Sequence, residues 1–102
     1  MELNTAQANL QQAVAALARD LPQLDTQDAC ARIAWLRREA MLEGFTPAVV
    51  MADGLADALK RDRRRTPVAA WLDALTLAAG CGRGTPDTAP ALLASVGVRY
   101  AA

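Results

Sequence analysis

Apolar residues recur every three to four positions along most of this chain, which is the spacing of amphipathic helices and not the alternation of strands. Over about residues 4–20 they form one stripe, and glutamines occupy the opposite side. Four further segments keep this periodicity, the last more weakly: about 26–43, 47–61, 67–79 and 87–95. The pattern predicts an all-α fold of four or five short helices in a compact bundle or an orthogonal array.

Threonine-proline pairs coincide with three of the predicted helix starts: Thr46-Pro47, Thr66-Pro67 and Thr85-Pro86. Threonine is a good N-cap, and proline suits the first helical position because it loses no hydrogen bond there. Gly44 and Gly80 precede the first and third pairs. We expect both glycines to end helices in the left-handed conformation.

The remaining boundary signals indicate one domain. Asp25 or Thr26 is the expected N-cap of the second helix. A chain of 102 residues is long enough for one domain and no more. We therefore expect a single helical domain over residues 1–96 and a flexible C-terminal tail over residues 97–102.

Two predicted helices carry more apolar surface than one core contact requires. The second has a stripe through Ile33 and Leu36, and a roughly opposite stripe through Trp35 and Leu42. The fourth is apolar almost all round. Such surfaces are either covered inside the molecule or shared with a partner. The candidate residues for a dimer seam or partner interface are Trp35, Leu42, Met51, Trp71, Leu75 and Leu77.

Two further patterns concern how the predicted helices are related and how they pack: a repeated tripeptide and a row of small residues. Ala34-Trp35-Leu36 returns as Ala70-Trp71-Leu72, which would fit an internal duplication or chance in an alanine-rich chain. In the third helix Met51, Gly54 and Ala58 form a flat edge where another helix could approach closely.

The charge balance argues against a nucleic-acid domain. The formal net charge is zero, although residues 1–59 carry a balance of −4 and residues 60–102 a balance of +4. The basic run from Lys60 to Arg65 falls at a predicted helix C-terminus, where cations complement the helix dipole. It has no interleaved aromatics, and the following helix has no side chain suited to reading a base edge. We expect electrostatic steering of an acidic partner by Arg37, Arg38, Arg63, Arg64 and Arg65.

The chain offers little reactive chemistry. It has no histidine, and its two cysteines, Cys30 and Cys81, are far apart, so neither a metal site nor a nucleophile-histidine pair is expected. The loop from Gly80 to Pro86 follows a predicted helix and lacks the ending of a phosphate-binding loop. No run of about 18 apolar residues occurs, so we expect no membrane span, and the polar N-terminal residues do not predict a secretory signal. We expect a cytoplasmic, bacterial-type protein that is not an enzyme and uses no cofactor.

One segment, "REAMLEGF" from Arg38 to Phe45, resembles the helix around the phosphorylated histidine of histidine-phosphotransfer bundles. Leu42 and Gly44 fit that pattern, but Ala40 stands at the histidine position and Glu43 replaces a lysine. The resemblance implies a similar bundle that docks a partner without phosphotransfer.

The function we expect is a non-catalytic protein-interaction module. It would be a small regulator, adaptor or inhibitor that docks through apolar contacts onto a protein, such as a transcription or signalling regulator, as a homodimer. The alternatives are a nucleic-acid-associated regulator that uses residues 60–65, and the histidine-free phosphotransfer-like bundle.

Overall fold

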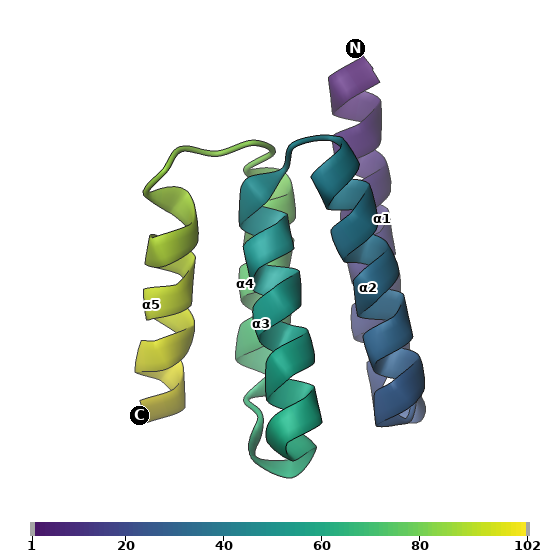
Figure 1. Ribbon diagram of the computed structural model, residues 1–102, viewed down its shortest axis with the longest axis vertical. Helices are drawn as coiled ribbons and strands as arrows, with labels where there is room; N and C mark the ends of the chain where they lie inside the picture. The colour runs from purple at the N-terminus through teal and green to yellow at the C-terminus, as the bar shows by residue number, and fades with distance from the viewer. Residues whose placement is uncertain (1, 102) are drawn as a thin grey trace.

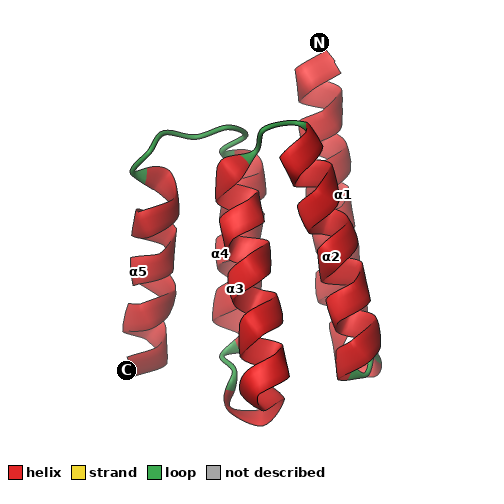
Figure 2. Ribbon diagram, viewed as in Figure 1, coloured by secondary structure: helices red, strands yellow, loops and turns green. Residues whose placement is uncertain are grey.

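A computed structural model describes the backbone of residues 2–101 and places the side chains of residues 5–97. Over residues 2–101 the chain forms helices joined by loops and turns, with no strand (Figures 1 and 2). Two 3₁₀ turns, η1 (Leu21–Gln23) and η2 (Arg63–Arg65), follow the first and third helices. The five α-helices are α1 (Glu2–Asp20), α2 (Thr26–Leu42), α3 (Thr46–Asp62), α4 (Val68–Gly80) and α5 (Thr88–Ala101). The predicted all-α class is confirmed, and the predicted helices agree with these bounds to within a few residues except at the end of α5.

The helices lie nearly parallel or antiparallel to one another, so the arrangement is a bundle and not an orthogonal array (Figure 1). Short connections make each helix run opposite to the one before it. Contacts join α1 to α2, α2 to α3, α3 to α4 and α4 back to α1, which closes a four-helix bundle. The fifth helix packs on the outside of that bundle, against α3 and α4.

The core of the bundle is apolar throughout. Every buried side chain among the described residues is apolar, and no buried side-chain nitrogen or oxygen lacks a hydrogen-bond partner. Leu17, Met51 and Leu55 have 0% of their surface exposed, and Phe45 has 1%. Within residues 5–97 the core therefore stabilises the fold by apolar burial.

Helix ends follow the sequence signals in part. The Asp25 carboxylate accepts a hydrogen bond from the backbone N–H of Asp28 at 2.7 Å, so the predicted N-cap of α2 is confirmed. Gly44 has φ of 74°, and the N–H of Phe45 reaches back to the carbonyl of Ala40 at 2.8 Å, as in a Schellman motif. The connection between α2 and α3 is thereby kept very short.

The predicted helix-end roles of Gly80, Thr66 and Thr46 were wrong. Gly80 is the last residue of α4, and the left-handed glycines of the next loop are Gly82 and Gly84. The Thr66 hydroxyl does not cap α4, because it lies 2.9 Å from the carbonyl oxygen of Ala58 and 2.7 Å from that of Asp62, at the end of α3. Thr46 likewise makes no capping hydrogen bond to α3, which has no side-chain cap. A threonine hydroxyl that donates to the end of the preceding helix satisfies carbonyl groups there instead of N–H groups of the following helix.

The last helix is longer than its sequence pattern predicted. It was expected over 87–95, but α5 runs from Thr88 to Ala101, because the residues after Ser95 offer no proline to stop it. Val96, with 5% of its surface exposed, and the half-buried Leu92 attach α5 to the rest of the molecule. The flexibility expected for residues 97–102 stays a prediction.

Candidate functional site

The outer surface of α2 is the main apolar surface that the bundle leaves uncovered. Trp35 has 53% of its surface exposed, Met41 51% and Leu42 74%. Ala31, one turn before Trp35, is exposed as well. The opposite side of the same helix, through Ile33, is buried in the core. The sequence-based interpretation of α2 as a helix with two apolar faces therefore describes one covered face and one open face.

A groove of about 350 Å³ lies beside this surface, between α1 and α2. Trp35 forms part of its wall, with Glu39 and Glu43 from the same helix. Neither glutamate has an ion-pair partner within 4.0 Å among the described residues. The other lining residues are Ala6, Asn9, Leu10 and Phe45. The surface thus combines apolar anchors with two uncompensated negative charges on the α1 side.

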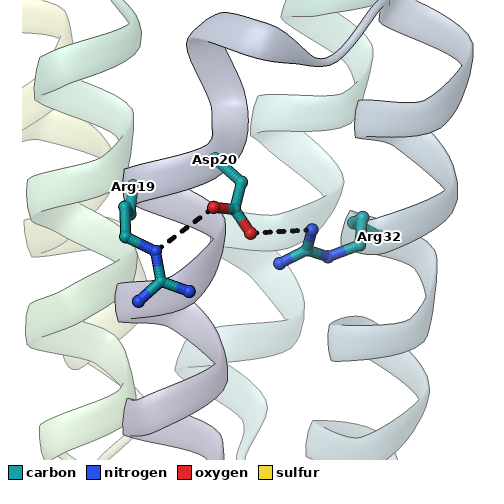
Figure 3. A network of polar contacts seen from close by, with 3 residues as sticks. All are labelled: Arg19, Asp20 and Arg32. Carbon is teal, nitrogen blue, oxygen red and sulfur yellow. Dashed lines mark hydrogen bonds and ion pairs between the residues drawn. The ribbon is translucent and has the colours of Figure 1, made fainter.

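Ion pairs hold α2 in place on both of its flanks. On the α3 side, Arg37 donates a hydrogen bond from its Nε to Asp53. On the α1 side, Asp20 accepts from Arg19 Nε at 3.2 Å and from Arg32 Nη1 at 3.3 Å (Figure 3). The hydrogen bond from Arg19 is the main reason that the pKa of Asp20 lies below its usual value, and Arg32 lowers it further against the opposing effect of desolvation. These contacts orient the open face of α2 without using Trp35 or Leu42.

The six predicted interface residues divide sharply in their exposure. Met51 and Leu75 are buried, with 0% and 1% of their surface exposed, and so neither can contact a partner of this folded chain. Trp71 is half-buried and packs against the core. Leu77 is 60% exposed on α4, but the neighbouring exposed positions on α4, Asp73 and Thr76, are polar. Trp35 and Leu42 are the two candidates that are exposed on one face of the same helix. Met41, which was not among the candidates, is also exposed on α2 and lies about 100° around the helix from Leu42.

Trp71 owes its partial burial to a glycine on the neighbouring helix. A Cβ atom at Gly54 would lie 2.4 Å from Cη2 and Cζ3 of Trp71, so the indole rests directly on the backbone of α3. The predicted flat edge of α3 is therefore occupied from within the molecule. It does not receive a helix of another molecule at that point.

The five arginines predicted to steer a partner differ in their contacts and exposure. Arg63 bridges the end of α3 to the turn between α1 and α2, donating to the Leu21 carbonyl at 3.0 Å and to the Thr26 hydroxyl at 3.3 Å. Arg37 is committed to Asp53, whereas Arg38, Arg64 and Arg65 are exposed. Arg65 also lies 3.7 Å from Asp62. The basic run therefore contains one structural arginine, and Arg38 is the cation that belongs to the open face of α2.

A second cavity, of about 410 Å³, separates part of α5 from the bundle. Trp71, Val96 and the 39% exposed Leu93 give it an apolar surface, and Arg61, Asp62 and Arg65 lie at its polar end. The Asp62 carboxylate is already occupied, because it accepts from the backbone N–H of Arg65. The packing of α5 against α3 and α4 is therefore incomplete at this end of the cavity.

The positions that the sequence singled out for possible chemistry are the two cysteines and Ala40. Cys30 is half-buried and Cys81 exposed, and both are free thiols. Ala40, which occupies the position of the phosphorylated histidine in the resemblance above, is 1% exposed. No cluster of potential metal ligands occurs over residues 2–101, and none of the described helices is both long and apolar enough to cross a membrane.

Comparisons of this chain with protein-family models, with curated proteins and with solved structures found no match. The open face of α2 therefore has to be interpreted from its own chemistry.

Proposed function

We propose that this chain is a non-catalytic protein-interaction module, a small cytoplasmic regulator, adaptor or inhibitor, that docks onto a partner protein through the outer surface of α2. The observation that carries the proposal is the exposure of Trp35 and Leu42 on one line of a helix whose opposite side is in the core. Tryptophan is among the residues that most often dominate binding energy at protein interfaces.

The energetics favour covering this surface. Burial of the exposed parts of Trp35 and Leu42 would contribute on the order of 6 kcal/mol at about 25 cal/mol per Å², before the entropic cost of association. The neighbouring carboxylates of Glu39 and Glu43 add a preference for a positively charged group on the partner. A partner helix with apolar residues along one side and a lysine or arginine next to them would satisfy both requirements.

Docking of this kind regulates by occlusion. A helix of the partner that binds along α2 is unavailable for its other contacts while the complex lasts. The groove between α1 and α2 offers room for one large side chain of that helix next to Trp35. This mode needs no cofactor and no catalytic group in the module.

The test is affinity capture from the native host, with immobilised full-length chain as bait and mass spectrometry as readout. Leu42→Lys should abolish capture of the specific partner, because it places a charge on the apolar part of the docking surface. Leu77→Lys is the matched control, since Leu77 is similarly exposed but lies on α4. A partner lost with Leu77→Lys and retained with Leu42→Lys would move the binding surface to α4, and the absence of any saturable partner would contradict the proposal.

A further inference from the structure

We propose that the outer surface of α2 also binds a second copy of this chain, with the two α2 helices side by side and parallel. This inference rests on the docking function proposed above and names the occupant of the same surface when no other partner is present. The homodimer expected from the sequence thereby acquires a defined seam.

The apolar stripe has the spacing of a helix-helix seam. Trp35 and Leu42 are seven residues apart, so they lie only about 20° from each other around the helix. Ala31 continues the stripe by one turn toward the N-terminus and is exposed. A line of this kind runs along the helix axis, and two such lines pack best when the helices lie at a small crossing angle.

Charges on the two sides of the stripe select the direction of packing. Arg38 and Glu39 lie on opposite sides of the line through Trp35 and Leu42, each about 50° away. A two-fold axis parallel to the helices brings Arg38 of each copy against Glu39 of the other copy, twice. A two-fold axis perpendicular to the helices instead brings Arg38 against Arg38 and Glu39 against Glu39. The parallel arrangement is therefore favoured, because like charges in contact are destabilising.

The groups needed for these contacts are available in the single chain. Arg38 is exposed, and neither Arg38 nor Glu39 has an ion pair within 4.0 Å among the described residues. The adjacent Arg37, in contrast, is already bound to Asp53. In the parallel dimer Glu43 lies on the same side as Glu39 and gives Arg38 of the other copy a second acceptor.

The size of the seam sets the expected strength. Helix α2 has 17 residues and is about 25 Å long, so one helix pair gives an interface at the small end of the range for specific complexes. We expect a dimer with a dissociation constant in the micromolar range, weak enough for a partner helix to displace the second copy. Dimerisation and partner docking then compete for Trp35 and Leu42.

The first experiment is sedimentation velocity of the full chain from about 1 to 500 µM. We expect a monomer-dimer equilibrium that Arg38→Glu and Glu39→Arg each weaken by roughly tenfold. The double variant with both substitutions should return the dissociation constant to within about threefold of the original. Arg64→Glu, which reverses an exposed arginine outside the seam, is the control and should have no effect. Thermal melting of each variant verifies the fold.

The second experiment fixes the direction of packing. In a Cys30→Ala, Cys81→Ser background, Leu42→Cys should form a disulfide-linked dimer rapidly on mild oxidation, because parallel packing brings position 42 near its counterpart. Ala15→Cys, exposed on α1, should form one slowly. Slow cross-linking at position 42 in a dimeric sample would overturn the parallel arrangement.

The remaining outcomes separate the two proposals. A monomer at every concentration, or a dimer that the charge exchange neither weakens nor restores, overturns the seam and leaves partner docking to the capture experiment. A dimer that behaves as described, with no other specific partner captured, supports the seam and contradicts the regulatory function.

Discussion

The same tripeptide, Ala-Trp-Leu, occurs once in α2 and once in α4, and its tryptophan is left open in one helix and covered in the other. Trp35 has 53% of its surface exposed, and its neighbour Leu36 is in the core. Trp71 is half-buried and lies on Gly54 of the adjacent helix. Two local sequences that are identical over three residues therefore have different roles, because the helix faces that meet them differ.

The difference shows which apolar surface of this chain the fold covers and which it leaves exposed. Around Trp71 the apolar surface is covered within the molecule, because α4 approaches α3 closely at a glycine and α5 packs on α3 and α4. Around Trp35 no further helix of the described chain covers α2 on its outer side. One region therefore stabilises the fold, and the other leaves apolar side chains exposed, where we propose that association occurs.

The largest expected effect is the loss of Trp71. Trp71→Ala should lower the free energy of unfolding by about 3 kcal/mol, because it leaves a cavity between α3 and α4. Chemical denaturation followed by circular dichroism measures it. A change below about 1 kcal/mol would contradict the structural role of Trp71 and remove the contrast between the two tryptophans.

Removal of the Arg63 side chain should have the next largest effect. Arg63→Ala removes two hydrogen bonds that join η2 to the turn between α1 and α2, and should lower stability by about 1.5 kcal/mol. Arg64→Ala, at the exposed neighbouring position, should change it by less than about 0.5 kcal/mol. Equal melting temperatures for the two variants would show that Arg63 is a surface charge like its neighbour.

Gly54 provides a test of the contact itself. In a helix, glycine-to-alanine substitution normally stabilises by about 1 kcal/mol, but at Gly54 the added Cβ collides with Trp71. Gly54→Ala should therefore destabilise the protein by about 1 kcal/mol. In the Trp71→Ala background the same substitution should become stabilising, and a double-mutant cycle measures the change of sign. If the sign stays the same in both backgrounds, Trp71 does not rest on Gly54.

Trp35→Ala should have a small effect on stability and a large effect on association. The free energy of unfolding measured at a concentration where the chain is monomeric should fall by about 1 kcal/mol, well below the effect of Trp71→Ala. Partner capture and the monomer-dimer equilibrium should both be weakened at least tenfold. If the substitution unfolds the chain, Trp35 belongs to the core after all and the open face of α2 is not a docking surface.

The smallest expected effect is the pH dependence contributed by Asp20, which helps to hold α2 against α1. The folded-state pKa of Asp20 is lowered, so its contribution to stability is fully present above the unfolded value of about 3.8 and is lost as pH falls through the folded value. The difference in melting temperature between the original chain and Asp20→Asn should therefore shrink below about pH 4. With Arg19→Ala and Arg32→Ala introduced, this pH dependence should disappear.

Among the helix ends, sequence signals were reliable where one residue satisfies its own helix. Asp25 caps α2, and Gly44 ends it, because both signals depend only on the backbone within a few residues. The role of Thr66 was not predictable in this way, since its hydroxyl contacts carbonyls of the preceding helix. Similarly, Arg63 looks like its neighbours in the sequence, and only the position of Leu21 and Thr26 makes it structural.

The sequence by itself determined the all-α class, the approximate bounds of the first four helices, and the two apolar faces of α2, because helical periodicity is a local property of the chain. Only the tertiary structure decided which of those faces is covered, that Met51 and Leu75 are core residues, and that Trp35, not Trp71, is the open tryptophan. Exposure depends on which helices pack together, and that packing brings together residues far apart in the sequence. Gly54 of α3 lies under Trp71 of α4, whereas about half of the Trp35 surface in α2 stays uncovered.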